Sequence, residues 1–147
     1  MKIRYVRKHE ILKAARIVGL NYSKAFELAA RREIKAAFKN PIIPPRYLVA
    51  EENGRMVGFA GFIQSWMDWH VYHIFWVNVE PTRQKEGIGT ELIKRTIQEI
   101  KTKKGRNKAS LILLTTTNVR FYERFGFRTI YRLSKKYSLM ALRLGSR

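Results

Sequence analysis

Cysteine is absent from this chain of 147 residues, which excludes disulfide bonds and thiolate metal sites. Three histidines and a single aspartate are present, and their positions lack the spacing of metal ligands. No apolar run approaches the roughly 20 residues that a membrane-spanning helix needs. The first residues also lack the apolar core and cleavage site of a signal peptide. We therefore expect a cytoplasmic protein that binds no metal.

Acidic residues are scarce: 11 Asp and Glu stand against 30 Lys and Arg, which leaves a net charge of +19. Residues 1–50 hold 12 basic and 3 acidic residues, residues 51–100 hold 5 and 7, and residues 101–147 hold 13 and 1. Basic ends attract polyanions, so an acidic partner such as the ribosome or another nucleic acid is one interpretation. A basic surface that serves solubility alone is the other.

The length and the apolar fraction of 46% predict one domain over residues 1–147. Hydrophobic periodicity predicts a mixed α/β sheet in the order β-α-α-β-β-β-α-β-α-β-β. Asn53 and Gly54 predict a tight hairpin turn. The strand at 70–79 is bulky on both alternate faces, which is typical of a buried central strand. Strands are expected at residues 3–6, 47–51, 56–63, 70–79, 111–114, 127–131 and 137–144, and helices at 9–38 with a break near Gly19, 88–103 and 118–125.

The segment 83–90, RQKEGIGT, joins the strand at 70–79 to the next helix. The first amides of a helix have no internal partner and carry partial positive charge, so such a junction can bind an anion. Glycines at 87 and 89 would let the backbone approach a phosphate closely. The Rossmann and Walker patterns do not match, because the third glycine and the Gly-Lys-Ser/Thr element are missing. A ligand-free turn is therefore the simpler interpretation of these glycines alone.

Two motifs in the right order favour a ligand. Gln84-x-x-Gly87-x-Gly89 resembles the Gln/Arg-x-x-Gly-x-Gly/Ala signature of the GNAT family of N-acetyltransferases, with Val77-x-Val79-x-Pro81 before it. The segment 118–127, NVRFYERFGF, resembles the family element Asn-x-x-Phe-Tyr-Glu-x-x-Gly-Phe, and the hairpin at 47–63 also fits. The resemblance implies the acyl-CoA N-acyltransferase fold, a splayed central sheet with helices on both faces.

The resemblance also implies a binding site for acetyl-CoA. In the family, backbone amides of the glycine loop hold the pyrophosphate, and the pantetheine arm binds along the preceding strand like an added strand. Glu86 departs from the family pattern, because a carboxylate repels phosphate; its side chain should point to water or pair with Lys85 or Arg83. The cofactor-binding residues implied in this way are Val77, Val79, Gln84, Lys85, Glu86, Gly87, Ile88, Gly89, Thr90 and Asn118.

The catalytic roles follow from the same resemblance. Tyr122 is the candidate general acid, because a phenol can hand a proton to the departing thiolate. Asn118 is expected to cap the short helix. His73 is the candidate base, because its ordinary pKa near 6.5 suits proton removal from an amine; a hydrogen-bonded core histidine is the alternative. By strand alternation, His73 should share a face with Phe75, Val77 and Val79.

The acceptor is expected to be a primary amine, most favourably of a protein or peptide, because a protein of charge +19 repels small polycations. In the family, the first two helices and the loop after the hairpin select the acceptor. Ordinary packing is the alternative role for their aromatic residues, and a non-catalytic acetyl-CoA-binding or nucleic-acid-binding module is the alternative function. The implied acceptor-binding residues are Tyr22, Phe26, Trp66 and Trp69, with Met67 between the two tryptophans.

Overall fold

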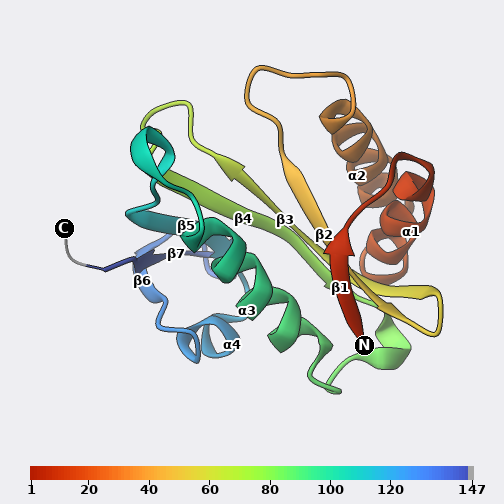
Figure 1. Ribbon diagram of the computed structural model, residues 1–147. Helices are drawn as coiled ribbons and strands as arrows, with labels where there is room; N and C mark the ends of the chain where they lie inside the picture. Colours follow the sequence, from red (N-terminus) through yellow and green to blue (C-terminus); the bar gives the residue numbers. More distant parts are fainter. Residues whose placement is uncertain (146–147) are drawn as a thin grey trace.

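The computed structural model describes residues 1–145, and its element order is the one that periodicity predicts (Figure 1). Two short 3-10 turns precede α1 and follow β4, and a third follows α3. The strands are β1 Lys2–Tyr5, β2 Arg46–Glu52, β3 Arg55–Gln64, β4 Val71–Val79, β5 Leu111–Thr116, β6 Arg128–Arg132 and β7 Ser138–Arg143, and the helices are α1 Ile11–Asn21, α2 Lys24–Ala37, α3 Ile88–Lys101 and α4 Val119–Glu123.

The strands form one sheet in the order β1-β2-β3-β4-β5-β7-β6. Neighbours are antiparallel except β4 and β5, which pair in parallel only from Val71 with Leu111 to His73 with Leu113. Beyond His73 the two strands separate, so the β5-facing edge of the rest of β4 has no strand partner within residues 1–145. The predicted splay of the central sheet is therefore confirmed.

Helices cover both faces of the sheet, as expected (Figure 1). On one face, α1 and α2 pack through Ala14, Val18 and Ile34 against β2 and β3. On the other face, α3 packs through Leu92, Ile93 and their helical neighbours. The middle of the sheet is therefore buried between apolar helix faces on both sides, which contributes to the stability of the fold.

The predicted break between the first two helices is present, but it lies at Tyr22 and Ser23 rather than at Gly19. Helix α1 continues to Asn21, and α2 begins after Ser23, whose Oγ accepts a hydrogen bond from the amide of Phe26 at 3.3 Å. A Cβ at Gly19 would lie 2.2 Å from the carboxylate of Glu27. The glycine therefore serves the close approach of two helices rather than the end of one.

A bulge in β4 overturns the predicted alternation. Trp76 has a positive φ of 51°, and the pairing of β4 with β3 shifts its register between Phe59 and Gly61. Phe75 and Trp76 both pack on the α1–α2 side, whereas Val77 packs on the α3 side. The extra residue moves every later side chain to the opposite face. His73 shares a face with Phe75 but not with Val77 or Val79, which corrects the expectation.

Within residues 1–145, no helix is both long and apolar enough to span a bilayer. No cluster of three or more His, Asp or Glu side chains occurs there that could hold a metal ion.

Candidate functional site

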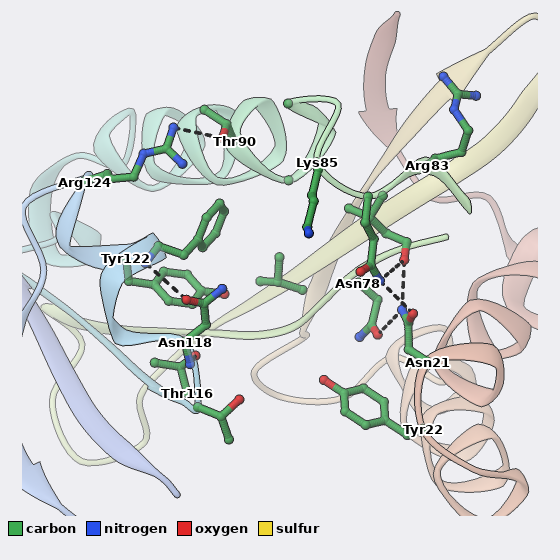
Figure 2. A pocket seen from close by; sticks show the side chains of 17 residues that line it. Asn21, Tyr22, Asn78, Arg83, Lys85, Thr90, Thr116, Asn118, Tyr122 and Arg124 are labelled. Carbon is green, nitrogen blue, oxygen red and sulfur yellow. Dashed lines mark hydrogen bonds between the residues drawn. The ribbon is translucent and has the colours of Figure 1, made fainter. Parts of the chain in front are cut away.

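A cavity of about 640 Å³ opens where β4 and β5 separate (Figure 2). Its walls come from three segments that are far apart in sequence: the end of α1, the stretch from the end of β4 through the loop to the start of α3, and the segment from β5 into α4. We call it the large cavity. It is lined by Asn21, Tyr22, Val77, Asn78, Val79, Arg83, Gln84, Lys85, Gly87, Gly89, Thr90, Thr116, Thr117, Asn118, Phe121, Tyr122 and Arg124.

The start of α3 presents bare backbone to this cavity. Gly87 adopts a φ of 87°, a left-handed conformation that favours glycine, and no side chain caps the helix. The amides of the first turn, from Ile88 to Thr90, have no intrahelical acceptor. A Cβ at Gly89 would lie 3.5 Å from the ring of Phe121, an ordinary contact, so packing alone does not require glycine there. The junction therefore has the geometry of an anion site.

The acidic side chain of this loop is held away from the amides. Both carboxylate oxygens of Glu86 accept hydrogen bonds from Nε of Arg83, at 3.0 and 3.1 Å. Nη2 of Arg83 also pairs with the carboxylate of Glu52, and the Arg83 side chain points out of the large cavity (Figure 2). These carboxylates raise the pKa of Arg83, with Glu52 contributing most. Of the three alternatives for Glu86, the structure has the pair with Arg83.

Two other cations face the large cavity without an acidic partner among residues 1–145. Lys85 points into the cavity from the loop, with a positive φ of 66° (Figure 2). Arg124 lies across the start of α3, where its Nη2 is 3.5 Å from Oγ1 of Thr90. Because the charge of Arg83 is already neutralised by Glu52 and Glu86, Lys85 and Arg124 supply the positive potential of this wall.

An amide network joins α1 to the end of β4 and to the loop. Nδ2 of Asn21 donates to Oδ1 of the buried Asn78 at 3.0 Å and to the carbonyl of Val79 at 2.9 Å. Nε2 of Gln84 donates to Oδ1 of Asn21 at 2.9 Å. Gln84, the first residue of the Gln-x-x-Gly-x-Gly motif, therefore positions the loop. Asn21 links α1 both to β4 and to this loop (Figure 2).

Removal of the Asn21 side chain tests this network. We expect Asn21→Ala to lower the free energy of unfolding by about 1–3 kcal/mol, because it leaves Oδ1 of the buried Asn78 without its donor. Urea denaturation measures the loss. The matched control is Arg16→Ala, an exposed position on the same helix, which should change stability by less than about 0.5 kcal/mol. Equal stability of the two variants would contradict the network.

Tyr122 stands where the large cavity meets a smaller one. The small cavity, of about 200 Å³, is lined by Tyr22, Ile74, Phe75, Trp76, Val77, Asn78, Leu114, Thr115, Thr116, Thr117, Tyr122 and Tyr137. Tyr122 is 8% exposed and its hydroxyl forms no hydrogen bond within residues 1–145. Burial raises the pKa of Tyr122, with a smaller contribution from Tyr22. The phenol therefore keeps its proton at the junction of the two cavities.

Most residues predicted from the loop and α4 meet at the large cavity, with two exceptions. Glu86 turns to Arg83, and Ile88 is buried in the core. Asn118 caps α4 as predicted, with its Oδ1 accepting from the amide of Phe121 at 3.3 Å. Sequence reasoning missed Asn21, Asn78, Arg83, Thr116, Thr117, Phe121 and Arg124. Two of these residues had a signal in the sequence. Asn78 stands between two valines of an apolar strand, and Arg124 lies inside the second motif.

Four predicted residues outside the loop line neither cavity, namely Phe26, His73, Trp66 and Trp69. His73 sits where β4 and β5 still pair, and it lines neither cavity. Burial lowers the pKa of His73. Trp66 and Trp69 belong to the β3–β4 connection, at the opposite end of β4 from the large cavity (Figure 1). These placements correct the expectation for the tryptophans, because acceptor and cofactor would meet at the other end of the strand.

Comparison with known proteins identifies this architecture. Residues 44–129 match the family described as Acetyltransferase (GNAT) domain. This match spans more than half of the chain, and the chain belongs to the GNAT family of acetyltransferases. It is an N-acetyltransferase that uses acetyl-CoA as its donor. No curated protein sequence matches the chain.

Solved structures agree on the fold at low sequence identity. A putative GNAT-family acetyltransferase from Desulfovibrio desulfuricans superposes with a TM-score of 0.84 at 20% identity, covering 97% of this chain and 98% of its own. An aminoglycoside 6'-N-acetyltransferase complexed with coenzyme A superposes with a TM-score of 0.71 at 19% identity, covering 100% of this chain and 99% of its own. A ribosomal-protein-alanine N-acetyltransferase from Brucella melitensis superposes with a TM-score of 0.74 at 16% identity, covering 98% of this chain and 100% of its own.

The residues present fit coenzyme A. The uncapped amides of α3, flanked by Lys85 and Arg124, suit a pyrophosphate. The unpaired edge of β4 suits an extended arm with amide groups, which can bond to the strand as an added strand would. The cavity between these two features leads directly to Tyr122.

Proposed function

We propose that this enzyme acetylates the α-amino group of a protein or peptide. The observation that carries the proposal is the composition of the small cavity, through which the acceptor would reach the hydroxyl of Tyr122. Its walls are neutral and rich in aromatic side chains, among them Tyr22, Trp76 and Tyr137. Phe26 continues the row behind them, with ring centroids 5.5 Å from Tyr22 and 6.4 Å from Trp76. Such walls suit a peptide side chain and main chain.

The charge of the site disfavours small polycationic acceptors. Among residues 1–145, no Asp or Glu lines either cavity. A polyamine or an aminoglycoside would enter a site without counter-charges on a protein of net charge +19. Coulomb repulsion then opposes binding at every approach. A peptide amine with neutral or acidic neighbours meets no such repulsion.

Within the described chain, no side chain that lines the cavities can act as a base, and this favours one kind of peptide amine over the other. No His, Asp or Glu side chain lines the cavities within residues 1–145, so water must remove the proton of the amine. An α-amino group has an ordinary pKa of about 7.8 and a lysine side chain one of about 10.4. At pH 7.5, about one third of the α-amine is neutral, against about 0.1% of the lysine. The α-amine is therefore the better nucleophile for this site.

Acetyl-CoA supplies an activated thioester, and the residues of this chain act around it. The amides of the unpaired β4 edge, most favourably that of Val77, would donate to the thioester carbonyl oxygen as negative charge develops there. Tyr122 would hold a proton for the sulfur that departs. Lys85, Arg124 and the first turn of α3 would hold the phosphates, while the Asn21 network keeps loop and strand in register.

Two peptides that differ in the position of their single free amine test the acceptor class. One has a free N-terminus and no lysine, and the other has an acetylated N-terminus and one lysine. At pH 7.5 we expect kcat/KM for the first peptide to be about 300-fold higher, because of its larger neutral fraction. Free thiol release measures the rate, with a peptide lacking both amines as the control. For the first peptide, kcat/KM should rise with pH and level off above about pH 8. Preference for the lysine peptide would contradict the proposal.

A further inference from the structure

A second exposed surface lies at the end of β4 that is remote from the cavities. It is formed by the β3–β4 connection, residues 65–70, and by the segment after α3, residues 101–108 (Figure 1). Nε2 of Gln64 donates to Oδ1 of Asn107 at 3.0 Å, and Nδ1 of His70 donates to the carbonyl of Lys108 at 2.6 Å. These bonds tie the two segments into one surface, which we call the remote surface.

The apolar side chains of the remote surface are unusually exposed. Trp66 is 69% exposed, Met67 93% and Trp69 43%. The loop that carries them is nevertheless ordered by its own hydrogen bonds, because Oγ of Ser65 accepts from the amide of Met67 at 3.0 Å and Asp68 accepts from the amide of His70 at 2.8 Å. An ordered loop that presents two indoles to solvent is a site of interaction rather than a disordered tip.

Charge surrounds these side chains. The segment 101–108, KTKKGRNK, has five basic residues and no acid, and Asp68 is the single acid of residues 65–70. The guanidinium of Arg106 lies 4.1 Å from the ring centroid of Trp69. This pair offers a flat, charged platform, while Trp66 offers a free indole nearby in the same loop.

We propose that the remote surface binds single-stranded RNA. Unpaired bases stack on exposed aromatic rings, and clustered cations hold the phosphates. Both parts occur together here, in the indoles of Trp66 and Trp69 and in the cations of residues 101–108. An acidic peptide would use the charge but leave the indole faces empty. Insertion into an anionic membrane is opposed by Asp68, an exposed carboxylate between the two tryptophans.

Fluorescence anisotropy of a labelled 12-nucleotide oligouridylate, titrated with the full chain, tests the proposal. We expect binding at low salt that weakens steeply with added salt. Trp66→Ala and Trp69→Ala should each weaken binding by about tenfold, because each removes one stacking platform. Lys104→Gln combined with Lys108→Gln should reduce the slope of log K against log salt by about 1.4. The matched control is Lys13→Gln on α1, an exposed lysine that should change binding less than twofold.

Three outcomes would overturn the proposal. The first is no binding of the oligonucleotide at 50 mM salt. The second is an equal effect of Trp66→Ala and Lys13→Gln, which would reduce the binding to general charge. The third is tighter binding to vesicles containing phosphatidylglycerol than to RNA, lost in Trp66→Ala, which would assign the surface to a membrane. Circular dichroism of each variant confirms that the fold is retained.

Discussion

Tyr122→Phe should lower kcat for acetyl transfer by about 100-fold or more while leaving the Kd for acetyl-CoA nearly unchanged. The substitution removes one oxygen, and this hydroxyl forms no hydrogen bond within residues 1–145. The ring keeps its packing against Phe121 and Phe127, with centroids 4.9 and 5.9 Å away. Stability is therefore expected to change little, and the loss should fall on the chemical step.

The pH dependence of kcat is a second test of the acid role of Tyr122. Burial raises the pKa of Tyr122 above its ordinary value near 10. A general acid acts in its protonated form, so the phenol stays competent through neutral and mildly alkaline pH. We expect kcat of the wild type not to decline between pH 7 and about 9.5.

Thiol release gives kcat, and calorimetric titration with acetyl-CoA gives Kd for wild type and variant. The control is Tyr131→Phe, an exposed tyrosine on β6 that lines neither cavity and should leave both constants unchanged. Wild-type turnover in Tyr122→Phe, or a matching loss of cofactor affinity, would remove the acid role.

Gly89→Leu should weaken acetyl-CoA binding by about 100-fold, which corresponds to about 2.7 kcal/mol. The new side chain would stand in the wall where backbone amides must approach the phosphates, and charge-assisted hydrogen bonds of this kind contribute about 1.5–3 kcal/mol each. Stability should not fall, because leucine is a better helix former than glycine and Gly89 has an ordinary helical position in α3.

Gly89→Ala is the matched control. Its Cβ would lie 3.5 Å from Phe121 and 3.7 Å from Val79, both ordinary contacts, so we expect a change in affinity of less than about threefold. Calorimetric titration measures both variants, and thermal unfolding without ligand confirms that neither has lost stability. Cofactor affinity of Gly89→Leu equal to that of Gly89→Ala would show that the phosphates do not approach this turn.

The elements and their order could be predicted because they depend on local chemistry. Helical periodicity, the Asn53–Gly54 turn with two positive φ angles, and the asparagine cap of α4 each involve residues close in sequence. The helix break was placed at Gly19 instead of Tyr22 and Ser23, because the role of that glycine depends on its contact with Glu27 on α2. The position of β7 between β5 and β6 also escaped prediction, because strand order depends on pairing between distant segments.

The candidate site also contains residues that the sequence predicted and residues that it missed. The loop residues from Gln84 to Thr90 were predicted because the two motifs resemble those of the GNAT family, whereas the glycines alone favoured a ligand-free turn. The face shared by His73, Val77 and Val79 was mispredicted because one bulge residue, Trp76, moves Val77 and Val79 to the opposite face. Asn21 and Asn78 were missed because their roles exist only as a pair, 57 residues apart in the chain.

The sequence by itself determined that this chain has a glycine-bearing helix start after a central strand and a buried-tyrosine motif further on. It did so because backbone conformation, capping and periodicity are properties of neighbouring residues. The tertiary structure alone decided which side chains meet there. It separated β4 from β5, joined Asn21 to Asn78, left the cavities without a carboxylate within residues 1–145, and placed Trp66 and Trp69 on the remote surface. Those outcomes depend on contacts between distant segments of the chain, which local sequence patterns do not determine.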